Sequence, residues 1–159
     1  MKAFFSLMFA AAMLTACATS PFNTSGRDIA PVDPGQALVR PGSIGATVIW
    51  GGRVVGVVNT PEQTELEVLS LPLGFGDRPR READGGARFV VRHPGFLEPM
   101  TYSPGRYITA MGRFSGVESR SVGAFPVDHP VLDSQQLELW PVDTNSSRTN
   151  LHLGAGFRF

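Results

Sequence analysis

The thiol of Cys17 is the side chain of this sequence with the clearest capacity for covalent chemistry, and it belongs to the only cysteine among 159 residues. It follows Lys2, an apolar run over residues 3–13 and a pair of small residues. A basic start, a short apolar core and small residues before a cleavage site are typical of a secretory signal peptide. The apolar run is shorter than the about 20 residues that a membrane-spanning helix needs. The sequence therefore predicts a cleavable export signal.

The four residues 14–17, Leu-Thr-Ala-Cys, resemble the lipobox of bacterial lipoproteins. The resemblance implies a diacylglyceryl thioether on Cys17, cleavage after Ala16 and acylation of the new amino group, so that residues 1–16 are a lipoprotein signal peptide. Two or more acyl chains anchor a protein stably, whereas a single chain binds reversibly. Ala18 is not the aspartate that retains many such proteins in the inner membrane, so the resemblance indicates the outer membrane. The alternative is a secretory signal that carries a cysteine by coincidence.

The other candidates for catalysis or metal binding are weak. His93, His129 and His152 lack metal-ligand spacing, and the first two each precede a proline, so we expect solvated turn residues there. Residues 41–45, "PGSIG", are similar to a nucleophile elbow but have proline where that motif requires glycine. The sequence contains no evident Ser-His-acid set, metal cluster or close acid pair. We therefore predict no enzyme, no metal and no cofactor, and, with Cys17 lipidated, no disulfide.

Arginine supplies the positive charge after the signal. Lys2 is the single lysine, so 13 of the 14 basic residues are arginines, against 14 acidic residues. A nucleic-acid partner would need a basic excess, so none is predicted. Arg78, Arg80 and Arg81 nevertheless cluster close to two acidic residues. This cluster is either a patch for anions or lipid headgroups on the face nearest the membrane or a solvated hairpin tip.

Four aromatic residues could line a ligand groove, because small barrels often bind along one face. These are Trp50, Tyr102, Tyr107 and Trp140, and the groove candidates that we retain are Trp50 and Tyr107. Packing in the core is the alternative, since most such aromatic side chains are buried.

Hydrophobic alternation predicts an all-β domain. Residues 45–59 are rich in β-branched side chains and are interrupted by Gly51-Gly52, which predicts two strands that meet at a turn or bulge. Residues 64–73 alternate in polarity up to Pro72, where the strand should end. Further strands are expected at residues 87–92, 106–116 (with a kink at Gly112), 121–127 and 136–142. Without a helical window of about 12 residues, this pattern suits a small barrel or sandwich of short strands.

The ends of the chain are expected to differ from the domain between them. Residues 17–42 are rich in proline and small polar residues, so the lipidated N-terminus should be a flexible tether that holds the domain, residues 43–142, off the bilayer. Residues 143–159 should be a polar linker and a C-terminal strand. The apolar alternation in residues 151–159 is typical of the last strand of an integral outer-membrane barrel. An edge strand that closes a small soluble barrel explains it as well and is preferred, because prolines interrupt the long strands that a membrane barrel needs.

Four stretches resemble the Slp-type, starvation-inducible outer-membrane lipoproteins of Gram-negative bacteria: residues 48–73, 86–99, 103–116 and 129–141. The most specific parts are residues 50–52, "WGG", and 104–112, "PGRYITAMG". This resemblance implies a lipid-anchored domain with an OB-like barrel and no catalytic residue set.

The predicted function is a non-enzymatic structural or interaction role in the cell envelope, related to stress or starvation. The protein would be bound to the outer membrane through the lipid on Cys17, would face the periplasm and would meet envelope protein partners there. A small-ligand or lipid-binding module that uses the barrel face is the alternative, followed by an integral outer-membrane β-barrel.

Overall fold

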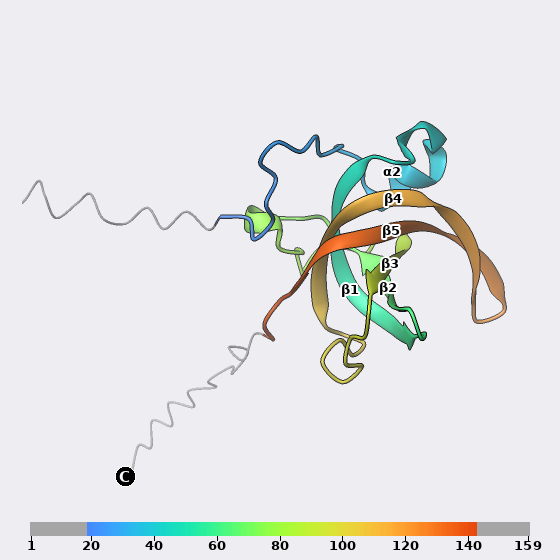
Figure 1. Ribbon diagram of the computed structural model, residues 1–159. Coiled ribbons are helices and arrows are strands. Elements are labelled where there is room, and N and C mark those ends of the chain that lie inside the picture. The colour runs from blue at the N-terminus through green and yellow to red at the C-terminus, as the bar shows by residue number, and fades with distance from the viewer. Residues whose placement is uncertain (1–18, 143–159) are drawn as a thin grey trace, which may run out of the picture.

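Five strands close into a barrel in the computed structural model, which describes residues 19–142. The order around the barrel is β1-β2-β3-β5-β4, and β4 pairs with β1 to close it (Figure 1). Neighbouring strands are antiparallel except for β3 and β5, which are parallel. This arrangement confirms the predicted all-β, OB-like barrel. The strands are β1 (Thr47–Asn59), β2 (Gln63–Ser70), β3 (Arg88–Pro94), β4 (Tyr107–Val122) and β5 (Phe125–Leu139).

Alternate side chains fill the interior of the barrel. In β2 the even-numbered residues are buried, whereas Glu65 and Glu67 face outward, as the period of a strand requires. Trp50 packs in the core, with its ring centroid 5.5 Å from those of both Phe89 and Phe114. The interior is thus apolar and the outer wall carries charge, whereas an integral membrane barrel carries an apolar band on its outer wall.

Glycines allow the strands to approach closely where the barrel bends. β1 runs through Gly51 and Gly52 as one strand, which differs from the expected pair of strands, and there it changes its pairing from β4 to β2. A Cβ on Gly52 would lie 2.0 Å from the carbonyl oxygen of Leu69, and one on Gly112 would lie 2.1 Å from that of Asp133. Close backbone contact, not a turn, therefore requires glycine at both positions.

β4 and β5 form one long hairpin. Residues 121–127, expected to be a separate strand, contain the end of β4, the turn and the start of β5. Gly123 in this turn has a φ of 61°, a conformation that favours glycine. The strands are therefore fewer and longer than the sequence pattern predicts.

A short helix precedes the barrel, in a segment whose sequence offers no helical window of about 12 residues. α2 (Pro34–Val39) has proline at its first position and Asp33 as its N-cap. The Asp33 carboxylate accepts a hydrogen bond from Gln36 N, and the Gln36 side chain accepts one from Asp33 N. This capping box stabilises a helix of fewer than two turns, and a 3-10 turn, η1 (Pro41–Ser43), follows it.

The described part of the expected tether contacts the barrel, so the structure differs from that expectation. The indole Nε1–H of Trp50 donates to the carbonyl oxygen of Val32 at 2.6 Å. Ala30 N donates to Thr47 O at 2.8 Å, and the side chain of Phe22 is buried. Pro34 and Pro41 each begin a short helical element in this segment, and the segment nevertheless packs against the barrel.

Several predictions concern residues outside the described range: the signal peptide with Ala16, the lipidation of Cys17, His152 and the strand at residues 151–159. They stay predictions, as do the domain boundaries. Within residues 19–142, no helix is long and apolar enough to cross a membrane.

Candidate functional site

The loop between β2 and β3, residues 71–87, carries the clustered arginines and lies at one end of the barrel. Its 3-10 turn η2 (Phe75–Asp77) is enclosed by two backbone hydrogen bonds, from Gly74 N to Arg78 O at 2.8 Å and from Arg80 N to Pro72 O at 2.9 Å. Figure 1 shows η2 beside the first described residues of the chain. We call this loop, together with Tyr107 and Trp140, the η2 end.

Two arginines of the η2 end stack on aromatic rings of β4 and of the chain after β5. The guanidinium carbon of Arg78 lies 4.7 Å from the centroid of Trp140, and that of Arg81 lies 4.7 Å from the centroid of Tyr107. Arg81 also donates through Nη2 to the carbonyl oxygen of Pro141 at 2.7 Å. Such cation–π contacts fix a guanidinium while retaining its charge. The arginine cluster and one predicted groove aromatic, Tyr107, are therefore brought together, but by contact with each other.

A buried hydroxyl fastens η2 to the barrel. Thr109 is fully buried in β4, and its Oγ1 donates to the carbonyl oxygen of Asp77 at 2.7 Å. The same oxygen accepts the indole N–H of Trp140 at 2.9 Å. One hydroxyl thus satisfies two groups that would otherwise be buried without partners, and it holds Trp140 in position under Arg78.

The η2 end combines exposed arginines with an exposed aromatic ring, and its loop also carries three acidic residues, Asp77, Glu82 and Asp84. Arg78 and Arg80 are exposed, and within residues 19–142 no ion pair joins either of them to a carboxylate. Phe75 is 73% exposed. These residues line a depression of about 330 Å³ with four neighbouring loop residues. The arrangement has the chemistry of a surface that binds anionic groups next to apolar ones.

The first described residues are attached to this same end. The Ser20 hydroxyl donates a hydrogen bond to the carboxylate of Asp77 in η2. Phe22 N donates to Ser20 Oγ at 3.1 Å, and the Phe22 ring is buried. A depression of about 430 Å³ lies between the two segments and is lined by Thr19, Pro21, Phe75, Gly76, Arg78 and Trp140. The chain therefore reaches the barrel at η2.

The predicted groove aromatics do not form a groove. Trp50 is only 2% exposed and packs between Phe89 and Phe114, so the interpretation of this residue as a ligand contact was wrong. Tyr107 is half-buried, with Arg81 over its ring. Sequence periodicity places both residues in strands but cannot tell which neighbours cover them.

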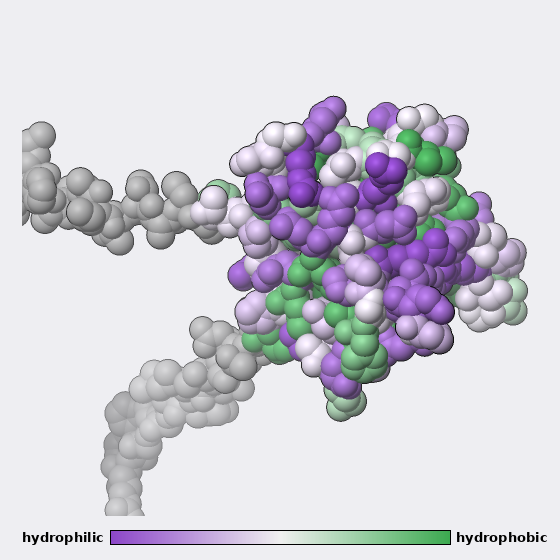
Figure 2. Space-filling view, viewed as in Figure 1, coloured by the Kyte–Doolittle hydropathy of each residue, from purple (hydrophilic) through white to green (hydrophobic). Residues whose placement is uncertain are grey.

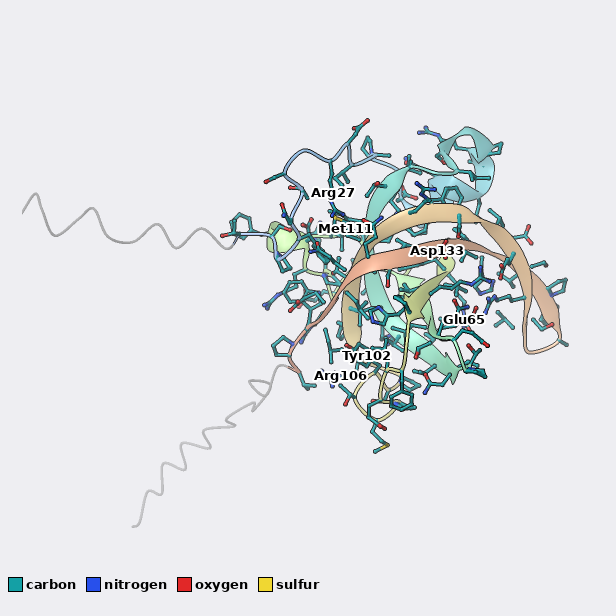
Figure 3. The ribbon with its side chains drawn as sticks, viewed as in Figure 1. Arg27, Glu65, Tyr102, Arg106, Met111 and Asp133 are labelled. Atoms are coloured by element: carbon teal, nitrogen blue, oxygen red, sulfur yellow. The ribbon has the colours of Figure 1, made fainter. Side chains whose placement is uncertain are left out.

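A ring of four charged side chains lies on the wall of the barrel, away from η2. Arg92 pairs with Glu65 at 3.0 Å and with Glu118 at 2.5 Å. Arg120 pairs with the same two carboxylates, at 2.8 Å each. These residues join β2, β3 and β4, and we call them the ion-pair wall. Figure 3 labels Glu65 there, and Figure 2 shows a hydrophilic area over this part of the surface.

The ion-pair wall explains the perturbed carboxyl groups without catalysis. The Arg120 hydrogen bond lowers the pKa of Glu65 below its usual value, although partial burial acts in the opposite direction. The pKa of Glu118 is lowered for the same first reason, the hydrogen bond from Arg120. A general acid at neutral pH needs a raised carboxyl pKa, so these groups act as partners of arginine.

The histidines that the structure describes lie in strands, so the expectation of solvated turn residues was wrong for both. His129 in β5 is fully buried, its Nδ1–H donates to Val127 O at 2.7 Å, and its Nε2 lies 3.4 Å from Glu67 Oε1. His93 in β3 is half-buried and lies 2.9 Å from Ser134 Oγ, and burial lowers the pKa of its imidazole. Residues 19–142 contain no group of three or more side chains placed to hold a metal.

Comparison with known proteins gives the family. The family model described as "Outer membrane lipoprotein Slp family" matches residues 14–154. The chain therefore belongs to the Slp family, and its predicted location, lipid-anchored at the outer membrane, is confirmed at the level of the family. The match begins at Leu14, the first residue of the predicted lipobox.

Curated relatives agree with this assignment. "Outer membrane protein Slp" of Escherichia coli K12 is 28% identical, over 80% of this chain and 69% of that protein. "Uncharacterized lipoprotein YeaY" of the same strain is 30% identical, over 82% and 68%. An uncharacterized protein of Haemophilus influenzae is 33% identical, over 62% of this chain and 54% of the relative. A small single-stranded DNA-binding protein from Streptomyces coelicolor has a TM-score of 0.40 at 14% identity, covering 60% of this chain and 94% of that chain, a likeness too weak to bear on function.

Proposed function

We propose that this protein is a non-enzymatic outer-membrane lipoprotein, anchored by lipid on Cys17, whose barrel faces the periplasm and has a structural or interaction role in the envelope. The observation that carries this proposal is the family match, which begins at the lipobox and continues through the whole barrel. The family resemblance adds a link to stress or starvation.

The chemistry of the barrel supports a role without catalysis. Apolar side chains fill the interior, including Trp50 and Phe89. The carboxyl groups with lowered pKa values are partners of Arg92 and Arg120 on the wall. Lipidation would consume the thiol of Cys17, the only cysteine. What the described surface does offer is charge and one exposed aromatic ring at the η2 end, which suits binding to another surface.

Labelling with radioactive palmitate tests the anchor. The wild type should be labelled and should fractionate with the outer membrane, whereas Cys17→Ser should lose the label and leave the membrane fraction. Ala18→Asp is the matched variant, because it keeps the lipid but introduces the residue that retains many lipoproteins in the inner membrane. An unlabelled wild type contradicts the proposal.

Two further measurements test the remaining parts. Protease added to intact cells should spare the barrel if it faces the periplasm and should degrade it only after the outer membrane is permeabilised. The amount of protein in starved and in growing cells tests the link to starvation, and equal amounts contradict it.

A further inference from the structure

The attachment of the first described residues to η2 limits how far the barrel can lie from the lipid. Ser20 is hydrogen bonded to Asp77 and Phe22 is buried in the domain, so the chain is attached to the domain at residue 20. Ser20 lies three positions after Cys17, and three extended residues span at most about 11 Å. The expected tether of residues 17–42 is thus replaced by a connection of only a few residues.

This length is comparable with the polar layer of a membrane. The headgroup region on each side of a bilayer is about 5–7 Å thick, and the lipid on Cys17 has its glyceryl group in that layer. A point of the protein within about 11 Å of Cys17 therefore lies at or just above the headgroups. That point is the η2 end, because Asp77 binds Ser20 directly.

The residues at this point have the chemistry that a bilayer surface selects. Arg78 and Arg80 are exposed and have no carboxylate partner within residues 19–142, and basic side chains near a membrane are attracted to anionic lipids. Phe75 lines one depression with Arg78 and Arg80 and another with Pro21. Its side chain is 73% exposed, and aromatic side chains insert at the headgroup boundary. The guanidinium of Arg78 stacks on the ring of Trp140, which holds it in one orientation.

We infer that the η2 end is a second contact with the membrane: Phe75 lies among the headgroups and Arg78 and Arg80 bind the phosphates of anionic lipids in the bilayer that holds the anchor. This inference rests on the proposed lipid attachment at Cys17. The barrel then has a fixed orientation. Its η2 end faces the bilayer, and the hairpin turn between β4 and β5, which lies far from η2 in Figure 1, points into the aqueous compartment.

Two exposed phenylalanines provide a matched test of this orientation. Phe75 at η2 is 73% exposed and Phe125 at the hairpin is 74% exposed. Because lipidation consumes the thiol of Cys17, Phe75→Cys and Phe125→Cys each carry a single free thiol for a fluorescent label. The full lipidated chain is reconstituted into vesicles of phosphatidylethanolamine and phosphatidylglycerol, with a quencher attached to the lipid headgroup.

We expect the label at residue 75 to be quenched at least about three times as strongly as the label at residue 125, because interfacial insertion brings residue 75 close to the headgroups. Equal quenching at both positions, with the protein still floating with the vesicles, overturns the inference and leaves the anchor intact. A lipidated wild type that does not float with the vesicles overturns the proposed anchor, and the inference with it.

The arginines are tested by charge reversal. Arg78→Glu combined with Arg80→Glu should reduce quenching at residue 75 while flotation persists, because the anchor is unchanged. Arg40→Glu combined with Arg113→Glu changes the charge equally at exposed positions away from η2 and should leave quenching unchanged. In vesicles of phosphatidylethanolamine and phosphatidylcholine, which contain no anionic lipid, the two double variants should show equal quenching at residue 75. Equal losses for both doubles in the anionic vesicles overturn the assignment of the contact to Arg78 and Arg80.

Discussion

The η2 end and the ion-pair wall use arginine in two different ways. On the wall, Arg92 and Arg120 each bridge Glu65 and Glu118, so positive and negative charge cancel over a short distance. At the η2 end, Arg78 lies over the ring of Trp140. An aromatic ring orients a guanidinium but leaves its full charge. The number of arginines therefore says little about the field around this protein, because the partner of each arginine decides whether its charge acts outward.

Among the substitutions considered, loss of Trp140 should lower the free energy of unfolding the most. This side chain is 8% exposed, supports Arg78 and donates to Thr109 Oγ1. Trp140→Ala should lower the free energy of unfolding by about 3–5 kcal/mol, measured by urea denaturation of the unlipidated chain that carries Cys17→Ser. Trp140→Phe keeps a ring under Arg78 and should lose clearly less. Equal losses for the two variants would show that the ring does not support the loop.

The hydroxyl of Thr109 should matter less than Trp140 but more than any single ion pair. Thr109→Val keeps the shape of the side chain and leaves the indole N–H of Trp140 and the carbonyl oxygen of Asp77 without this partner. Loss of a buried partner costs about 1–3 kcal/mol. Urea denaturation measures the loss, and proteolysis of the loop should accelerate along with it. Thr109→Ser restores the hydroxyl and should recover most of the stability.

The ion-pair wall should make the free energy of unfolding depend on pH. The folded-state pKa values of Glu65 and Glu118 are lowered from the usual 4.5, so their stabilisation is present above pH 4.5 and disappears as the pH falls through the lower folded-state values. Glu65→Gln should cost about 1 kcal/mol at neutral pH and should flatten the loss of stability in acid. Glu62→Gln, at an exposed position outside the wall, serves as the control. A wild-type acid profile unchanged by Glu65→Gln would contradict the network.

The smallest expected effect on stability comes from Ser20→Ala. The hydroxyl bridges Asp77 and Phe22 N at the surface, so its loss should cost less than about 1 kcal/mol. Limited proteolysis near residue 20 should nevertheless become faster, because the segment is released from η2. Ser25→Ala, in the same exposed segment, should leave the cleavage rate unchanged. If Ser20→Ala changes neither quantity, burial of Phe22 alone holds the segment.

Local patterns in the sequence predicted the strands but not their partners. The alternation around Glu65 and Glu67 identified the inward face of β2 correctly, because a strand repeats every two residues. Gly51-Gly52 was interpreted as a break because glycine at a turn and glycine at a close backbone contact look the same in one sequence. The choice between a barrel and a sandwich depends on which strands pair, and the pairing of β3 with β5 joins residues about 40 positions apart.

The candidate site was only partly predictable for the same reason. The arginine cluster was visible, but Arg78 meets Trp140 and Arg81 meets Tyr107 across long sequence separations. The packing of residues 19–42 did leave a local signal. Asp33-Pro34-Gly35-Gln36 has the residues of a capping box with proline at the first helical position, and this signal was missed in a segment dominated by proline composition.

The position of β5 in the sheet has a consequence for how the chain matures. β5 is the last described strand of the chain and pairs with both β3 and β4, so it completes the barrel on two sides. A chain that emerges from a translocation channel with its N-terminus first cannot close the barrel until residue 139 has emerged. Until then β3 and β4 present unpaired edges, which are prone to association with other strands. Lipid processing near the N-terminus is therefore expected to precede folding, and a nascent chain halted before β5 should need protection from aggregation.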